Sequence, residues 1–186
     1  MMDQIDFESL RTSCIEKLSE SQGRVSELSG FLGFDGFVDE IIHVVDKREN
    51  AKDYTRLGTI EEFGKRVLGA AGRSSNIELV TQRTKIGGNG PIMANALCAA
   101  GLPVTYVGAL GKDAVHPVIK EFAEKTHAIT VSDPGLTNAL EFKDGKIMMG
   151  ITNTLESLTY ESIIEAMGEG AFHDTLSRSS LVALVN

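Results

Sequence analysis

The chain has 186 residues, of which 42% are hydrophobic and 24% charged, the composition of an ordinary soluble domain with one core. Its formal net charge of −8 excludes the basic face that a sequence-independent nucleic-acid binder requires, so no nucleic-acid partner is expected. Its two cysteines, Cys14 and Cys98, have neither a disulfide framework nor a metal-ligand spacing, and we therefore expect a protein of the reducing cytoplasm.

The first 27 residues differ in pattern from the rest of the chain. Phe7, Leu10, Cys14 and Leu18 recur three to four positions apart, which predicts an amphipathic helix. Acidic residues come early and no continuous apolar stretch is present, so we expect neither a signal peptide nor a membrane span, and no membrane partner. We predict that residues 1–27 form an added helix that packs against the domain formed by the rest.

The next region predicts strands and one helix. Its apolar runs have the composition of strands: residues 28–34, 37–45 and 77–86. The dipeptide Asp35-Gly36 is a turn signal between the first two runs. A helix over residues 58–68 is indicated by Thr59 and Glu62, which are spaced as a capping box.

A glycine-rich turn precedes the next predicted helix, residues 91–100. Gly87 and Gly88 allow the backbone to approach a ligand closely, since no Cβ is in the way. Gly90 is expected to cap the helix, and Gly101 to end it. The helix is apolar nearly all round, so we expect it to be buried, with free N–H groups directed at a ligand in the turn.

The remaining residues alternate between strands and helices, with one hairpin. Strands are expected at 104–109, 128–131 and 181–186. Helices are expected at 115–125, with Asp113 as its cap, and at 159–167. A hairpin is indicated over residues 137–151, with its turn at Asp144-Gly145.

The region around the glycine turn matches one signature at these positions: Gly87, Gly88, Ala94, Gly101, Val107, Gly108, Gly111 and Asp113. In this pattern, residues 28–186 resemble the ribokinase-like (PfkB) family of sugar and nucleoside kinases. The resemblance implies an α/β fold with a mostly parallel, three-layer α/β/α core and a small lid of β-strands over the sugar. The candidate lid strands are residues 37–45, 77–86 and 137–151.

The same resemblance implies ATP-dependent phosphoryl transfer to a hydroxyl of a sugar or related polyol, with Mg²⁺ accompanying ATP. Asp39 matches the family's substrate-binding aspartate, whereas Asp35 is either a second such group or only a turn residue. Ile92 replaces the family's substrate-contacting asparagine, which leaves Asn89 and Asn95 as candidates for that role. The substrate-binding residues that we predict are Asp35, Asp39, Gly87, Gly88, Asn89, Thr137 and Asn153.

The apolar run of residues 181–186 predicts a strand inside a parallel sheet, where a further neighbouring strand is expected. The chain contains no Gly-Ala-Gly-Asp-like segment, which in the resembled family supplies the anion hole and the catalytic aspartate. We therefore expect the front part of a kinase, incomplete at its C-terminus, with the nucleotide site and catalytic base outside this chain. Alone, it should be inactive, and we expect self-association through the lid strands or an exposed sheet edge.

Two alternatives remain open. Gly88, Gly90 and Ala94 also fit the fingerprint of a Rossmann-type dinucleotide-binding oxidoreductase, but the strand that follows ends without the acidic residue that holds a ribose. The other alternative is a non-catalytic sugar-binding or regulatory half that pairs with another chain. A phosphate loop at residues 111–113 is excluded by its spacing, and the scattered histidines support neither metal nor serine hydrolase chemistry.

Overall fold

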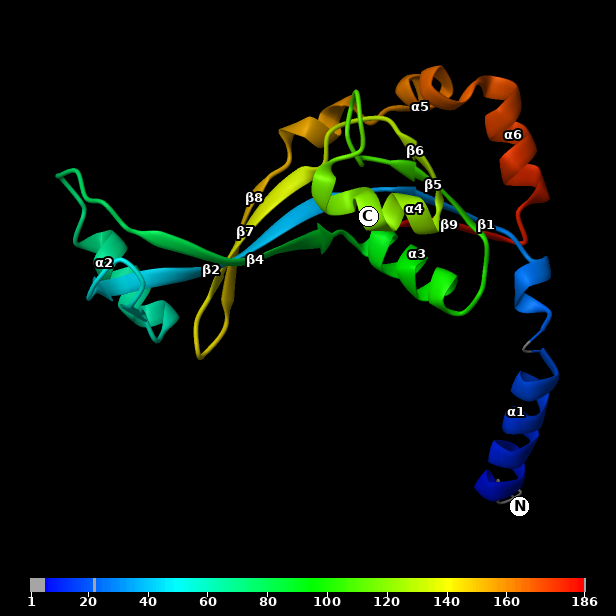
Figure 1. The fold of residues 1–186 in the computed structure, drawn as a ribbon, viewed down its shortest axis with the longest axis horizontal. Coiled ribbons are helices and arrows are strands. Elements are labelled where there is room, and N and C mark those ends of the chain that lie inside the picture. The colour runs from blue at the N-terminus through cyan, green and yellow to red at the C-terminus, as the bar shows by residue number, and fades with distance from the viewer. Residues whose placement is uncertain (1–5, 22, 186) are drawn as a thin grey trace, which may run out of the picture.

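The computed structural model describes residues 6–21 and 23–185, and Figure 1 shows their arrangement. The helices are α1 (Phe7–Ser21), η1 (Val25–Glu27), α2 (Ile60–Leu68), α3 (Asn89–Ala99), η2 (Pro117–Ile119), α4 (Lys120–Lys125), η3 (Asn153–Ser157), α5 (Tyr160–Met167) and α6 (Glu169–Arg178), where η marks 3₁₀ helices. The strands are β1 (Gly30–Phe34), β2 (Phe37–Arg48), β3 (Tyr54–Arg56), β4 (Leu79–Gly87), β5 (Val104–Gly108), β6 (His127–Thr130), β7 (Gly135–Glu141), β8 (Lys146–Ile151) and β9 (Leu181–Val185).

The first sheet is parallel and has the strand order β6-β5-β1-β9. Helices cover both of its faces, which confirms the predicted three-layer α/β/α core (Figure 1). Strand β1 contributes side chains to both layers of this core. Leu32 packs in the layer of α3 and α4, its neighbour Phe31 packs in the layer of α5 and α6, and neither side chain is exposed. A strand buried on both faces is expected to be apolar without alternation, as β1 is.

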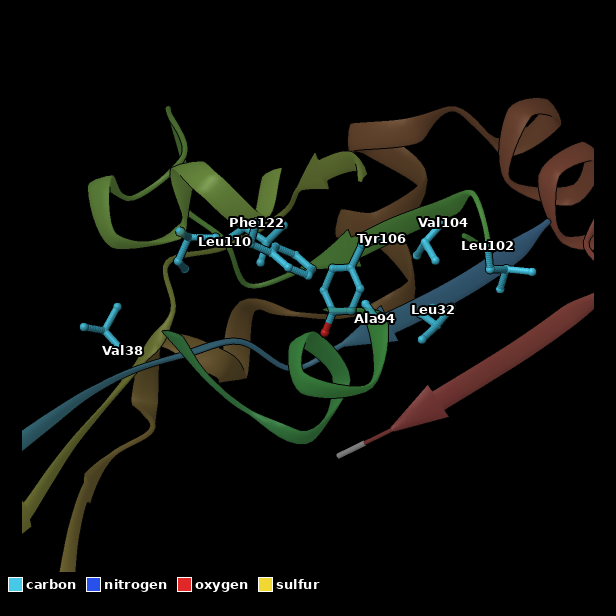
Figure 2. Close-up of a cluster of buried hydrophobic side chains, with 9 residues drawn as sticks. Leu32, Val38, Ala94, Leu102, Val104, Tyr106, Leu110 and Phe122 are labelled. Atoms are coloured by element: carbon cyan, nitrogen blue, oxygen red, sulfur yellow. The ribbon is translucent and has the colours of Figure 1, made fainter. Parts of the chain in front are cut away.

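The core beneath α3 and α4 contains Leu32 from β1, Tyr106 from β5, Ala94 from α3 and Phe122 from α4 (Figure 2). Tyr106 and Phe122 meet edge to face, with their ring centroids 5.1 Å apart. The opposite layer packs Phe31 and Val107 against Ile163 of α5, with side chains of α6 beside them. Helix α6 was not anticipated from the sequence.

The second sheet is built around the long strand β2. Strand β4 pairs with β2 in antiparallel fashion on one side, β7 pairs in parallel on the other, and β8 and β3 complete the sheet. The three strand runs that were lid candidates therefore lie in one sheet, which extends away from the parallel sheet in Figure 1. Helix α2 packs on the far end, and its expected capping box between Thr59 and Glu62 is present.

Helix α3 differs from the expectation in two respects. It begins earlier than predicted, with Gly88 rather than Gly90 at the N-cap, because Gly88 takes a φ of +95° that turns the chain into the helix. The helix is also not buried all round, since only Gly90, Pro91 and Ala94 are buried and Ile92 is 56% exposed. The parallel sheet covers only one side of it.

Two other expectations need correction. Asp113 does not cap the next helix: the His116 side chain accepts from the Val118 N–H, and the segment opens with a 3₁₀ turn before α4. Helix α1 does not pack on the domain, since none of its described residues is buried and it projects from the sheets in Figure 1. Strand β9 agrees with the expectation: it is parallel to β1, and among the described residues β1 is its only neighbour, which leaves its other edge open; residue 186 lies outside them.

Candidate functional site

The candidate site lies where β1 ends and β2 begins, at the junction of the two sheets. A hollow of about 320 Å³ opens there. It is lined by Asp35, Phe37, Asp39, Gly88, Asn89, Ile92, Thr137 and Met148. These residues come from the turn between β1 and β2, from β2 itself, from the start of α3, and from β7 and β8. The carboxyl ends of parallel strands are the usual place for a ligand in an α/β fold.

Asp35 ties the β1–β2 turn to the start of α3. Its Oδ2 accepts the Asn89 N–H at 2.8 Å and its Oδ1 accepts the Gly90 N–H at 2.8 Å. The Tyr106 hydroxyl donates to the Asp35 carbonyl oxygen at 2.6 Å and lies 3.3 Å from Oδ1. Asp35 is only 5% exposed, so these bonds replace those that water would make.

Burial shifts the pKa values of both Asp35 and Tyr106. Burial raises the pKa of Asp35, and the hydrogen bonds from Gly90, Asn89 and Tyr106 oppose that rise. The pKa of Tyr106 is raised by burial and by the neighbouring Asp35 carboxylate, so the tyrosine stays a neutral hydrogen-bond donor. Two backbone N–H bonds at 2.8 Å match an ionised carboxylate, which accepts on both oxygens.

The start of α3 does not offer N–H groups to a ligand, contrary to the expectation from the glycine turn. Asp35 takes the N–H groups of Asn89 and Gly90, Pro91 has none, and the Ile92 N–H donates to the Gly88 carbonyl at 3.2 Å. The backbone N–H groups of the first turn of α3 are therefore all hydrogen-bonded within the protein. The hollow presents hydrogen-bond acceptors rather than an anion cradle.

Asp39 is the more available of the two carboxylates. Strand pairing places it between Lys85 of β4 and Thr137 of β7. Among the residues that the structure describes, its only charged neighbour within ion-pair distance is Lys85, whose Nζ lies 3.7 Å from Asp39 Oδ2. No hydrogen bond within the described chain occupies the Asp39 carboxylate, so both oxygens can accept from a ligand.

Two glycines make room for this arrangement. A Cβ at Gly87 would lie 2.4 Å from both carboxylate oxygens of Asp39, and a Cβ at Gly88 would lie 2.7 Å from Asp35 Oδ2. Real Cβ atoms do not come so close, and the positive φ of Gly88 adds a second reason for glycine. The two carboxylates can approach the turn only because both positions lack side chains.

The structure brings most of the predicted site residues together. Asp35, Asp39, Gly88, Asn89 and Thr137 line the hollow, and Gly87 adjoins it through Asp39. Asn153 does not line it, because it opens η3 and is exposed to solvent.

Of the two asparagines considered in place of Ile92, Asn89 lines the hollow and Asn95 does not. Asn95 lies beside Cys98 and Lys125 on another side of α3.

Sequence reasoning missed the apolar lining and one anchor. Phe37 lies two positions before Asp39 on the same strand, so the period of two could have placed it on the same face. Tyr106 carried no signal, because its partner Asp35 is 71 residues away in sequence.

A second, more apolar hollow of about 340 Å³ lies at the ends of β1 and β9. It shares Asp35 with the first and is otherwise lined by Phe34, Leu155, Leu158, Leu184 and Val185. Its lining offers few polar groups to orient a hydroxylated ligand.

Neither a metal site nor a membrane segment emerges from the part of the chain that is described. Among residues 6–21 and 23–185, no three His, Cys, Asp or Glu side chains are grouped to hold a metal ion. The described residues thus do not fit a Mg²⁺ site of their own. Within the same ranges, no helix is long and apolar enough to cross a membrane.

A parallel sheet covered on both faces, with a second sheet that begins across the β1–β2 turn beside a glycine turn, defines the ribokinase-like fold. Two of the solved structures that share it illustrate the match. The crystal structure of Sa239 matches with a TM-score of 0.52 and 16% identity, over 84% of this chain and 45% of that one. Ribokinase from Giardia lamblia matches with a TM-score of 0.51 and 15% identity, over 84% of this chain and 41% of that one.

Sequence comparison identifies the family to which the chain belongs. The model of the prokaryotic ketohexokinase family matches residues 5–184, and the chain belongs to this family of ribokinase-like (PfkB) carbohydrate kinases. Ketohexokinase of Haloferax volcanii is 30% identical over 174 residues, which are 92% of this chain and 45% of that protein. The chain thus spans less than half the length of these relatives.

The dinucleotide-binding alternative lacks its structural basis. A Rossmann fingerprint requires the strand before the glycines to lie in the parallel sheet with the strand that follows the helix. Strand β4, which enters the glycine turn, instead lies in the second sheet and runs antiparallel to β2.

Proposed function

We propose that this chain holds the sugar in an ATP-dependent transfer of a phosphoryl group to a hydroxyl of a ketohexose. The observation that carries the proposal is the hollow at the sheet junction, where the Asp39 carboxylate accepts no hydrogen bond within the described chain and faces the glycine turn. The names of the family and of the Haloferax volcanii relative supply the sugar class.

The chemistry of the hollow suits a neutral polyhydroxyl ligand. Asp39 is an acceptor that needs donors, and the hydroxyls of a sugar are donors. Asn89 and Thr137 add side chains that both donate and accept. An anionic ligand would meet two carboxylates, of which Lys85 offsets only that of Asp39, and no free N–H at the helix start, so sugar phosphates and acidic sugars are disfavoured.

In this proposal, the chain positions the acceptor sugar and does not move the proton. Phosphoryl transfer depends chiefly on positioning and charge stabilisation, and these require a nucleotide site as well as a sugar site. The 186 residues carry no Gly-Ala-Gly-Asp-like segment. We assign the nucleotide site, the Mg²⁺ that accompanies ATP and the catalytic base to residues outside this chain, and we expect no transfer by the chain alone.

The test is a calorimetric titration of D-fructose into the wild-type chain and into Asp39→Asn. Hydrogen bonds to a charged acceptor contribute about 1.5–3 kcal/mol, so the variant should bind roughly ten- to a hundredfold more weakly. Asp46→Asn is the control, because Asp46 lies on the same strand but pairs with Arg66, away from the hollow. Equal affinity of Asp39→Asn and wild type would remove Asp39 from the site, and no binding by the wild type would reject the proposed function.

A further inference from the structure

One side of the hollow is apolar. Phe37 from β2, Ile92 from α3 and Met148 from β8 line it together with the carboxylates. Ile92 is 56% exposed and Met148 is 58% exposed. Single exposed apolar residues are common on protein surfaces, but these come from three different elements and converge on one cavity.

The strand register places two of these side chains on the same sheet face as Asp39. Phe37 and Asp39 are two residues apart on β2, so their side chains share a face. Asp39 pairs with Thr137 of β7. Ala139, two residues further along β7, pairs with Met148 of β8, which therefore lies on the same face. Gly135 leaves room for the aromatic ring, since a Cβ there would lie 2.5 Å from a Phe37 ring carbon. The face thus carries one polar row, Lys85, Asp39 and Thr137, flanked by apolar groups.

Ile92, on helix α3, is the third apolar residue that lines the hollow. It lies in the first turn of α3, three residues after Asn89. An isoleucine side chain can neither donate nor accept a hydrogen bond. A sugar hydroxyl turned toward it loses its bonds to water and gains no partner in the protein.

We propose that Ile92 determines the sugar specificity of this hollow by leaving one hydroxyl of a ketohexose without a partner. This proposal rests on the proposed function, and it narrows the sugars that bind from ketohexoses in general to those that need no hydroxyl at one particular carbon. The site accepts neutral sugars that are deoxygenated at the one carbon facing α3, and it requires the hydroxyls that face Asp39 and Thr137.

The inference is tested with a panel of probes: D-fructose and its 1-, 3-, 4- and 6-deoxy derivatives. Each is titrated calorimetrically into the wild-type chain and into Ile92→Asn. In the wild type, one derivative should bind at least as tightly as D-fructose, while derivatives that lack a hydroxyl facing the polar row bind more weakly. In Ile92→Asn, the preference for D-fructose over that one derivative should rise about three- to tenfold, the range of a single net hydrogen bond.

The control variant is Val67→Asn, which also places an asparagine at an exposed apolar position of a helix, away from the hollow. It should leave every ratio unchanged. If D-fructose binds but all four derivatives lose affinity equally in wild type and Ile92→Asn, this inference is wrong and the proposed function stands. If the wild type binds none of the five sugars, both are wrong.

Discussion

Asp35 and Asp39 lie four positions apart and have different roles in the structure. Asp35 is 5% exposed and holds the start of α3 through two backbone N–H groups. Asp39 has one ion-pair neighbour at 3.7 Å and faces the hollow. The first residue therefore shapes the site, and the second is available to a ligand.

This division predicts that Asp35→Ala destabilises the fold more than Asp39→Ala. Removing Asp35 leaves the N–H groups of Asn89 and Gly90 unpaired. Each buried donor without a partner costs about 1–3 kcal/mol, so the free energy of unfolding should fall by at least roughly 2 kcal/mol. Urea denaturation of both variants provides the comparison, and equal midpoints for Asp35→Ala and wild type would contradict the role given to Asp35.

Gly88 offers a sharper test of the turn, with a matched control in Gly72. Both have positive φ, +95° and +75°, but a Cβ at Gly72 meets nothing within 4 Å, whereas one at Gly88 meets Asp35 Oδ2 at 2.7 Å. Backbone strain in the left-handed region costs a non-glycine residue about 1–2 kcal/mol, and an alanine at Gly88, whose ψ of 142° lies in a region open essentially only to glycine, should cost at least as much. We expect Gly88→Ala to lose more stability than Gly72→Ala, because the carboxylate must also move. Equal losses in thermal unfolding would show that Asp35 does not lie against the turn.

At the scale of elements, short sequence motifs predicted the positions of helices and turns correctly where neighbouring residues alone determine those positions. The capping box at Thr59 and Glu62 marked the start of α2, and the turn at Asp144-Gly145 marked the hairpin of β7 and β8. The start of α3 was misplaced because its cap depends on the φ of Gly88 and on Asp35, which is more than 50 residues distant. The exposed side of α3 depends on which sheet covers it, and an apolar sequence does not reveal that.

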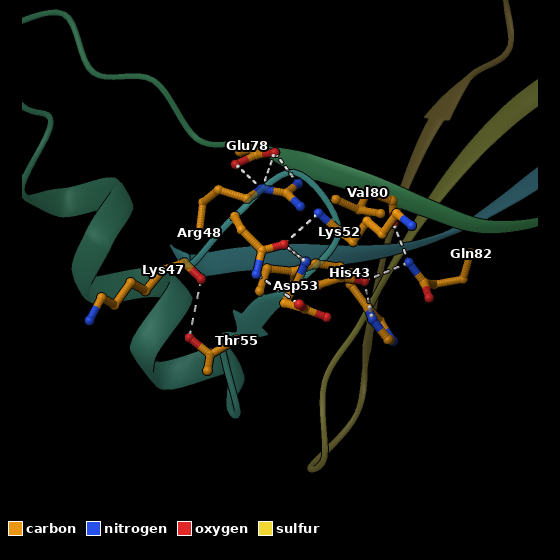
Figure 3. Close-up of polar contacts among 11 residues, drawn as sticks. His43, Lys47, Arg48, Lys52, Asp53, Thr55, Glu78, Val80 and Gln82 are labelled. Carbon is orange, nitrogen blue, oxygen red and sulfur yellow. Dashed lines mark hydrogen bonds and ion pairs between the residues drawn. The ribbon is translucent and has the colours of Figure 1, made fainter.

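The far end of the second sheet contains a polar cluster that joins β2, β3 and β4 (Figure 3). The His43 ring lies between Arg56, whose Nη1 is 2.7 Å from Nε2, and Tyr54, whose hydroxyl is 3.1 Å from Nδ1. Gln82 of β4 donates to the same Tyr54 hydroxyl at 2.8 Å. A guanidinium only donates, so His43 accepts at Nε2 and is neutral in this arrangement.

The cluster predicts a pH dependence of stability. The pKa of His43 is lowered by burial and by the charge of Arg56, which Glu141 partly opposes. In the unfolded chain, the imidazole titrates near its usual pKa of about 6.5, so below that pH the unfolded state takes up the proton first. Stability is therefore full above about pH 6.5 and falls as the pH drops toward the lowered pKa.

The measurement is the urea midpoint between about pH 7.5 and 5 for wild type, His43→Gln and the control His173→Gln, whose residue is exposed on α6. His43→Gln should flatten the decline, and His173→Gln should retain it. An unchanged slope in His43→Gln would assign the pH dependence to other groups.

At the scale of the whole molecule, the chain passes several times between two sheets with different surroundings. The resemblance to ribokinase-like kinases implied the three-layer core, and the sequence patterns predicted β2, β4, β7 and β8 of the second sheet but not β3. Their pairing was not predictable, because β3 and α2 separate β4 from β2 along the chain, and five further elements, α3 to β6, separate β7 from β4. The apolar side of the hollow has the same origin, since Phe37, Ile92 and Met148 meet only after both sheets form.

The β9 side of the parallel sheet predicts self-association. Among the described residues β9 pairs only with β1, and Val182 and Leu184 are 44% and 60% exposed. A strand with an open edge and apolar side chains is a template for another chain. Size-exclusion chromatography with light scattering should show dimers or larger species that Leu184→Lys reduces, and a concentration-independent monomer would contradict this expectation.

The central claim is that the hollow between the two sheets is the sugar site, and an amide NMR titration with D-fructose tests it most directly. The account predicts shifts confined to the residues around the hollow: 35–39, 87–92, 135–137 and 148. Helix α2 and the His43 cluster should keep their signals. Shifts centred instead on Leu155, Leu158 and Leu184, which line the more apolar hollow at the end of β9, would contradict the claim, as would a spectrum that does not respond to the sugar.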